Sequence, residues 1–231
     1  MMKPGRPDRL EQAEAVIASL FDERVAVAVT DPLAPQPPAM GSEAEHLSRA
    51  VAKRQREFAA GRAAARRAMA VLGLPPVSLP SGEDRVPLWP AGVQGSISHT
   101  LALCAAAVTT EPLHLGLDIE GDSDLNPGLL QTICTPQEIA RIAGPEQGRL
   151  AKLTFSAKEA AFKAQYPVTG LTFGFDHMEI AFDHPTKRFT ATFLKPAGRF
   201  SVGHQLKGRF DAVEGHLVTA VMAGQSGSEG A

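Results

Sequence analysis

Two short motifs gather the side chains best suited to chemistry. The first is Gly116-Leu117-Asp118-Ile119-Glu120, and the second is Phe155-Ser156-Ala157-Lys158-Glu159-Ala160-Ala161-Phe162-Lys163. They supply the carboxylates of Asp118, Glu120 and Glu159 and the ammonium groups of Lys158 and Lys163. Carboxylates bind Mg²⁺, a hard cation, and lysines neutralise phosphate oxygens. The two motifs together predict a magnesium site that handles phosphates.

The first motif has the alternation of a β-strand. Apolar side chains stand at Leu113, Leu115, Leu117 and Ile119. Because alternate side chains of a strand share a face, Asp118 and Glu120 should lie on one face, about 6 to 7 Å apart at the backbone. They could bind one cation, and Gly116 on the same face would let a ligand approach the backbone. A solvated acidic face at a strand end is the alternative.

The second motif has helical spacing. Apolar residues recur at Leu150, Leu153, Ala157, Ala160 and Ala164. This pattern predicts a helix that ends before Pro167 and carries Glu159 and Lys163 one turn apart. Two structural alternatives remain: a surface ion pair worth a few tenths of a kcal/mol, or a capping box of Ser156 and Glu159. The stripe that starts at Leu150 weakens the second, because it places Ser156 inside the helix.

Two further segments carry polar and basic groups. One is Trp89-Pro90-Ala91-Gly92-Val93-Gln94-Gly95-Ser96-Ile97-Ser98-His99, and the other runs from Lys53 to Arg67 with six basic residues and one acid. A helix face with Arg54, Arg62 and Arg66 suits an anionic ligand, because guanidinium groups make forked contacts with phosphate. A solvated face is the alternative, and we prefer it for Arg56 and Arg67.

These four segments resemble the 4′-phosphopantetheinyl transferases of the larger bacterial kind, the enterobactin synthetase component D and surfactin-synthetase-activating type. The family blocks W-P-x-G-x-x-G-S-x-S-H, G-x-D-x-E and [WF]-x-x-K-E-x-x-x-K all occur in order, and Arg54 to Arg66 is similar to the family's basic helix. The likeness is strong from Arg54 to Pro167. Related enzymes often carry a lysine ahead of the tryptophan block, where this chain has Ser81 and, nearby, Arg85.

The resemblance implies an α+β fold, a pseudo-dimer of two similar α/β subdomains with coenzyme A in the cleft between them. We expect an N-terminal subdomain at residues 1–110, a C-terminal subdomain at 111–223 and a disordered tail at 224–231. A cleft between domains is also where ligand sites are expected in general.

The resemblance also implies a reaction. A serine of an apo acyl or peptidyl carrier protein attacks the β-phosphorus of coenzyme A, and adenosine 3′,5′-bisphosphate leaves. Mg²⁺ is expected on Asp118, Glu120 and Glu159, with Glu159 also acting as general base, either directly or through a metal-bound water. Lys158 and Lys163 are expected to neutralise phosphate charge. The residues expected to bind coenzyme A are Arg54, Arg62, Arg66, Arg85, Ser98 and His99, although a single histidine after a strand is more often structural.

Two other classes of function remain as alternatives. A different magnesium phosphoesterase would also use three carboxylates and lysines, but it would need neither the Trp89 to His99 block nor the basic helix. A non-catalytic module that binds coenzyme A or a carrier protein would be expected to lose a carboxylate, whereas all three are present.

Composition limits the kinds of partner and the cellular compartment that we expect. The chain has 231 residues and a net charge of −2, which argues against nucleic acid as a partner. Cys104 and Cys134 are the only cysteines, and Cys104 is expected to be a buried small hydrophobe. No apolar run approaches the roughly 18 residues of a membrane span, and no signal peptide is apparent. A cytoplasmic monomer in a reducing compartment is therefore expected.

The remaining elements follow from periodicity and turn residues. We expect strands at 25–29, 96–99, 101–108, 178–182, 189–194 and 217–222, a further strand around Phe210, and a helix over 42–72. The proline-rich segment from Asp31 to Gly41 is expected to be a linker loop.

Overall fold

The structure, a computed structural model, describes residues 8–46 and 51–224. Its N-terminal half contains α1 (Arg9–Ser19), β1 (Ala26–Thr30), η1 (Gly41–His46), α2 (Ala52–Val71), β2 (Gln94–His99) and β3 (Cys104–Thr109). The three strands form an antiparallel sheet in the order β1-β3-β2. Small side chains such as Ala64, Ala68 and Ala106 let α2 pack closely on this sheet.

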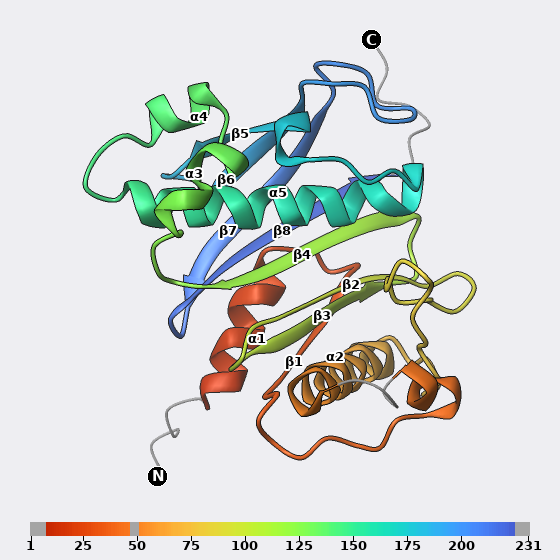
Figure 1. The fold of residues 1–231 in the computed structure, drawn as a ribbon. Helices are drawn as coiled ribbons and strands as arrows, with labels where there is room; N and C mark the ends of the chain where they lie inside the picture. Colours follow the sequence, from red (N-terminus) through yellow and green to blue (C-terminus); the bar gives the residue numbers. More distant parts are fainter. Residues whose placement is uncertain (1–7, 47–50, 225–231) are drawn as a thin grey trace.

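The C-terminal half is built around β4 (Leu113–Gly121) and the long helix α5 (Gln147–Thr169). Between them lie η2 (Pro127–Leu129), α3 (Leu130–Ile133) and α4 (Pro136–Arg141), and after them come η3 (Phe175–His177), β5 (Met178–Asp183), β6 (Arg188–Phe193), β7 (Gln205–Val213) and β8 (His216–Gly224). The five strands pair antiparallel in the order β4-β8-β7-β6-β5. Figure 1 shows α5 lying across this sheet, as α2 lies against the smaller one.

The molecule is thus α+β, with one sheet and one main helix in each half, as expected for a pseudo-dimer. Helix α1 packs where the halves meet, because its residues Ala13 and Ile17 belong to one core with apolar residues of β1, β3, β4 and β8. A second core lies between α5 and strands β5 to β8. The two halves therefore share a continuous apolar junction.

Strands β2 and β4 face each other across that junction without a regular backbone ladder. Serine hydroxyls take the place of backbone carbonyls. Ser96 Oγ accepts the N–H of Leu117 at 3.0 Å, and Ser98 Oγ accepts the N–H of Ile119 at 3.1 Å. The two serines of the Gly95 to His99 block therefore fix the register between the subdomains.

Side chains cap the two outermost strands in the same way. On β1 the N–H of Val29 donates to Glu14 Oε2 at 2.9 Å, and its carbonyl accepts from Arg67 at 2.7 Å. On β5 the N–H of Ile180 donates to Glu138 Oε1 at 2.6 Å, and its carbonyl accepts from Arg141 at 3.0 Å. A Glu and an Arg thus satisfy the outward peptide groups at one position of each edge strand.

Two glycines of the sequence motifs have packing roles. A Cβ on Gly116 would lie 1.8 Å from the carbonyl oxygen of Ala160 in α5. The expectation that Gly116 lets a ligand approach is therefore wrong, since the helix backbone already occupies that side. A Cβ on Gly95 would lie 2.4 Å from the Trp89 ring, so this glycine makes room for the indole.

The elements differ from the sequence prediction at several ends. Pro167 lies inside α5, which continues to Thr169 and ends at Gly170 in the left-handed conformation. A proline in the last turn removes only one hydrogen bond. The predicted helix at 42–72 is instead η1 followed by α2, with residues 47–50 outside the described part, and β7 extends well beyond Phe210. The linker at 31–41 forms no strand or α-helix. The predicted tail lies outside the described residues except for Gly224, which ends β8.

Candidate active site

Asp118 lies at the junction of the two subdomains and is only 4% exposed. Its Oδ1 atom pairs with Lys163 Nζ from α5 at 2.7 Å and accepts the hydroxyl of Ser98 from β2 at 3.0 Å. Its Oδ2 atom is buried and has no hydrogen-bond partner among the described residues. A buried carboxylate oxygen without a partner is costly, so this atom is a candidate ligand for a cation.

The three carboxylates of the two motifs influence one another electrostatically. Burial and then the charge of Asp118 raise the pKa of Glu159, although Lys163 opposes the shift and Glu120 adds to it. Burial and then Asp118 also raise the pKa of Glu120, against the charge of Lys152. A cation beside Asp118 would oppose the raised pKa values of Glu120 and Glu159.

The arrangement fits a hard cation in its chemistry but is not a ready-made cage. In residues 8–46 and 51–224 no three His, Cys, Asp or Glu side chains are gathered closely enough to hold a metal ion. Asp118 pairs with Lys163, and Glu120 lies 3.4 Å from Lys152 Nζ. The bare oxygen of Asp118 and the mutual repulsion of the carboxylates support Mg²⁺, which needs only one or two protein carboxylates. The metal set Asp118, Glu120 and Glu159 stays a prediction.

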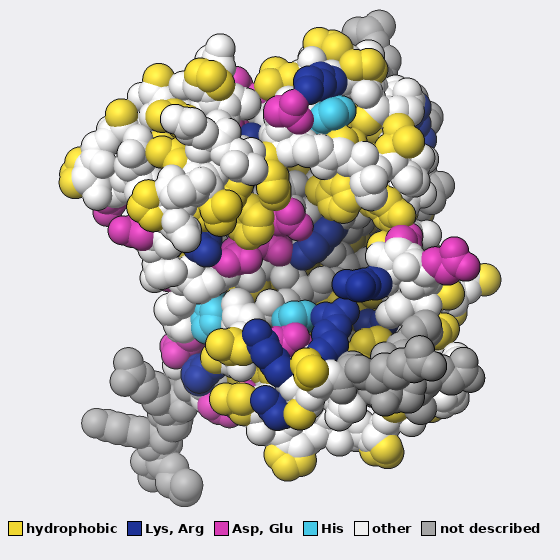
Figure 2. Space-filling model, viewed as in Figure 1, with side chains coloured by type: hydrophobic (Ala, Val, Ile, Leu, Met, Phe, Trp, Pro, Cys, Tyr) yellow, Lys and Arg dark blue, Asp and Glu magenta, His cyan; other side chains and the backbone are white. Residues whose placement is uncertain are grey.

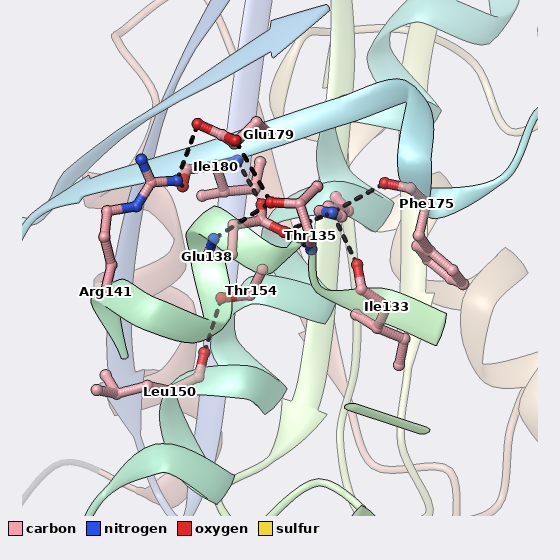
Figure 3. A network of polar contacts seen from close by, with 10 residues as sticks. Ile133, Thr135, Glu138, Arg141, Leu150, Thr154, Phe175, Glu179 and Ile180 are labelled. Carbon is pink, nitrogen blue, oxygen red and sulfur yellow. Dashed lines mark hydrogen bonds and ion pairs between the residues drawn. The ribbon is translucent and has the colours of Figure 1, made fainter. Parts of the chain in front are cut away.

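The ammonium of Lys158 is turned toward the protein interior, where it pairs with buried Glu138. Its ammonium is 2% exposed and lies 2.8 Å from Glu138 Oε2, while it also donates to the carbonyls of Ile133 at 2.7 Å and Phe175 at 2.8 Å. An ammonium has three donors. All three are used within the protein, by Glu138, Ile133 and Phe175, which are labelled in Figure 3. That Lys158 neutralises phosphate charge stays a prediction.

Arg54 and His99 meet across the cleft wall of the N-terminal subdomain, with Arg54 Nη1 3.5 Å from His99 Nε2. Burial lowers the pKa of His99, the positive charges of Arg54 and Lys163 lower it further, and Asp118 acts in the opposite sense. His99 therefore senses charges of both subdomains. Figure 2 shows the groove between the halves, with acidic side chains gathered on the wall below α5 and Lys, Arg and His side chains across from them.

Arg62 and Arg66 are committed to protein partners. Arg62 is 5% exposed, lies 4.2 Å over the Phe58 ring, and donates to the carbonyl of Leu79 and to Ser81 Oγ. Burial lowers its pKa to about 10. Arg66 forms a buried ion pair with Glu43 at 2.6 Å. Both guanidiniums hold the segment around residue 79 to α2. Their contact with coenzyme A stays a prediction.

Ser98 is likewise occupied. Its hydroxyl donates to Asp118 and accepts from Ile119 N and, at 3.3 Å, from Lys163 Nζ. A hydroxyl has one donor and two acceptor sites. Ser98 therefore orients Asp118, and its contact with coenzyme A stays a prediction.

A small hairpin of the N-terminal subdomain reaches across to α5. Ser81 and Pro87 form an isolated bridge, and Arg85, at the turn, has a φ of 67° and an exposed side chain. At its tip Asp84 Oδ2 accepts the hydroxyl of Tyr166 from α5 at 2.6 Å. Sequence reasoning missed this pair, although Tyr166 follows Glu159 and Lys163 at helical spacing. The role of Arg85 stays a prediction.

An apolar pocket of about 90 Å³ lies beside Glu159. Its other lining residues are Lys158, Phe162, Phe173, Gly174, Phe175 and Met178. The aromatic rings pack on one another, with the centroids of Phe162 and Phe173 5.6 Å apart and edge to face. The pocket could hold a slender, weakly polar chain next to the carboxylate.

Neither cysteine is suited to act as a nucleophile. Both are buried and unpaired, and burial raises the pKa of Cys104 to about 12 and that of Cys134 to about 11. Thiols with such pKa values are almost fully protonated near neutral pH. Among the described helices, none is long and apolar enough to cross a membrane.

Comparison with known proteins identifies the class. A family model described as the 4′-phosphopantetheinyl transferase N-terminal domain matches residues 42–109, and the 4′-phosphopantetheinyl transferase superfamily model matches residues 114–221. The chain therefore belongs to the 4′-phosphopantetheinyl transferase superfamily, and it is an enzyme of that class.

Named relatives agree with this assignment. 4′-Phosphopantetheinyl transferase Svp of Streptomyces mobaraensis is 43% identical over 188 residues, covering 78% of this chain and 76% of the relative. 4′-Phosphopantetheinyl transferase PptT of Mycobacterium tuberculosis is 31% identical over 223 residues, covering 91% and 96%. Enterobactin synthase component D of Escherichia coli K12 is 42% identical over 122 residues, covering 51% and 58%.

Proposed function

We propose that this transferase moves the 4′-phosphopantetheine group from coenzyme A to a serine of an apo acyl or peptidyl carrier protein, with Mg²⁺, and releases adenosine 3′,5′-bisphosphate. One observation carries the proposal: the bare Oδ2 of buried Asp118 lies where β2, β4 and α5 meet, next to Lys163. A phosphoryl-type transfer depends mainly on positioning and charge neutralisation.

Three carboxylates would hold the metal. Asp118 offers its unpartnered oxygen, and Glu120 and Glu159 have raised pKa values that a cation would lower. When bound, Mg²⁺ neutralises charge on the diphosphate of coenzyme A.

Side chains of α5 would handle the proton and the remaining charge. Glu159 lies beside Asp118 and lines the apolar pocket, so as general base it would take the proton of the attacking serine, directly or through a metal-bound water. Lys163 reaches the cleft one turn later and donates to Asp118 Oδ1 and to the carbonyl of Leu117. Its third donor position would contact a phosphate oxygen in place of the long contact to Ser98.

The two ends of coenzyme A would occupy different regions. Arg54 and His99, with exposed Arg85, would bind the nucleotide end, because they carry cationic or ionisable groups on the N-terminal wall. The apolar pocket beside Glu159 would hold the pantetheine arm. The diphosphate would then lie between them, beside Asp118.

Incubation of the purified protein with coenzyme A, Mg²⁺ and several apo carriers, followed by intact-protein mass measurement, tests the function. We expect a carrier to gain about 340 Da, as one phosphopantetheine group. Chelation should abolish the gain, and Asp118→Asn should lower the rate by about 100-fold or more. Release of adenosine bisphosphate without a carrier gaining mass would favour a phosphoesterase, and binding without either product would favour a non-catalytic module.

The residues of the site do not distinguish one carrier protein from another, so the assay with several apo carriers identifies the substrate. Carriers of peptide synthetases, including those for siderophores, of polyketide synthases and of fatty-acid synthesis all present the same serine chemistry. A reducing cytoplasm suits two buried, unpaired thiols. We propose that the enzyme acts there as a monomer.

A further inference from the structure

A buried ion pair joins Lys158 of the second motif to Glu138 of α4. Glu138 and Lys158 have side chains that are 1% and 2% exposed, with Glu138 Oε2 2.8 Å from Lys158 Nζ. Removing two charges from water is costly, and an apolar pair of similar size is often as stable. A role beyond stability is therefore worth seeking for this pair.

The ammonium of Lys158 joins three separate segments to α5. Its hydrogen bonds reach the carbonyl of Ile133 at the end of α3, the carboxylate of Glu138 in α4 and the carbonyl of Phe175 in η3 (Figure 3). Glu138 in turn accepts the N–H groups of Thr135 at 2.7 Å and Ile180 at 2.6 Å. The pair thus fixes α4, η3 and β5 to the residue directly before Glu159.

The segment held at Phe175 is a wall of the pocket. Residues Phe173, Gly174 and Phe175 line it, and none of them belongs to a strand. The hydrogen bond from Lys158 to the Phe175 carbonyl therefore sets the distance between this wall and Glu159, which lines the same pocket.

We propose that Glu138 is a positioning residue for the transfer, because it holds the ammonium of Lys158, whose hydrogen bond to the Phe175 carbonyl fixes the wall that aligns the pantetheine arm with Glu159. This inference rests on the function proposed above. Glu138 would touch neither substrate nor metal, and it would act through Lys158 and Phe175.

The double variant Glu138→Gln, Lys158→Met tests the proposal. It removes both charges and keeps similar side-chain lengths, so neither partner is left as an unpaired buried charge. We expect the dissociation constant for coenzyme A to rise about tenfold and kcat to fall by about 10- to 100-fold, since small misplacements near the chemistry are costly. Affinity for adenosine 3′,5′-bisphosphate, which lacks the arm, should change less than about twofold, as judged by calorimetry.

Glu179→Gln is the matched control, because it neutralises an ion pair with Arg141 between the same α4 and β5 without reaching α5. It should leave both affinities and kcat unchanged. Glu138→Asp, which shortens the carboxylate arm by one methylene and leaves Lys158 in the pocket lining, should show the same selective loss for coenzyme A.

Equal loss of both ligands, or no loss of either in a folded variant, would overturn the positioning role. These outcomes are distinct from failure of the proposed function, in which the unmodified enzyme itself would bind no coenzyme A or load no carrier.

Discussion

Ser98 of the N-terminal subdomain donates a 3.0 Å hydrogen bond to Asp118 Oδ1 of the C-terminal subdomain. The same hydroxyl accepts the N–H of Ile119, so it orients the carboxylate and joins β2 to β4 at once. The relative position of the two halves is therefore coupled to the orientation of the Asp118 carboxylate, which we expect to bind the metal.

Ser98→Ala should lose stability and metal affinity together. The buried N–H of Ile119 would lose its partner, at a cost of about 1 to 3 kcal/mol in the free energy of unfolding. The Mg²⁺ concentration for half-maximal activity should also rise. Ser96→Ala is the control, because it leaves the N–H of Leu117 unsatisfied at similar cost but does not touch Asp118. Denaturant unfolding measures the loss of stability in both variants, and Mg²⁺ titration of activity measures their metal affinity. If both variants need the same Mg²⁺ concentration for half-maximal activity, Ser98 does not orient Asp118 for the metal.

Glu159→Gln should raise the melting temperature in a chelator at neutral pH. Burial and the charge of Asp118 raise the pKa of Glu159 in the folded protein, so its ionised form destabilises the fold. That penalty develops as pH rises through the unfolded-state value near 4.5 and is complete above the folded-state pKa. The variant's advantage should therefore vanish below about pH 4.5. Mg²⁺ should stabilise the unmodified protein more than the variant, and calorimetric scans with and without Mg²⁺ would show it.

Arg54 and Arg62 should behave differently when each is replaced by alanine. Arg54→Ala should raise the KM for coenzyme A about tenfold, because a charge-assisted contact is worth about 1.5 to 3 kcal/mol. It should matter far less with dephospho-coenzyme A, which lacks the 3′-phosphate. Arg62→Ala should mainly lower the melting temperature, since its guanidinium holds Leu79 and Ser81.

Arg56→Ala provides the control for Arg54, because Arg56 is exposed on the same helix and lines a separate groove with residues 33–39. Equal losses with both donors in Arg54→Ala would place Arg54 elsewhere than at the 3′-phosphate.

His99 should take up a proton when coenzyme A binds. Burial and the charges of Arg54 and Lys163 hold its pKa below the ordinary value of 6.5 in the free protein. A phosphate group beside it would raise that pKa, so protons should be bound at pH values between the two. Calorimetry at pH 6.5 in buffers of different ionisation enthalpy measures the uptake, which His99→Gln should abolish. No buffer dependence in the unmodified enzyme would contradict the contact.

The elements that carry the acidic motifs could be predicted because each is buried on one side. Alternation along β4 and the stripe of small residues along α5 reflect directly which side meets the core. Helix α1 was missed although its signals were present. Asp8 and Glu11 form a capping box, and Ala13 and Ile17 are spaced one turn apart and buried.

The chemistry of individual side chains was harder to predict than the segments that carry them. A sequence shows that Arg66 and Lys158 are cationic, but not that Glu43 and Glu138 come to meet them from 23 and 20 positions away. Asp118 and Lys163 were expected at one site and do form an ion pair. Whether a cation faces ligand or protein depends on partners that only the folded chain brings together.

The side chains that cap the edge strands of the two sheets should affect aggregation when the protein is concentrated. An uncapped outer strand presents peptide groups on which a neighbouring chain can extend the sheet and begin an aggregate. At Val29 and Ile180 those groups are already bonded to Glu14, Arg67, Glu138 and Arg141. Losing Glu14 or Arg141 should therefore matter least to catalysis and most to how concentrated the protein can become before it precipitates.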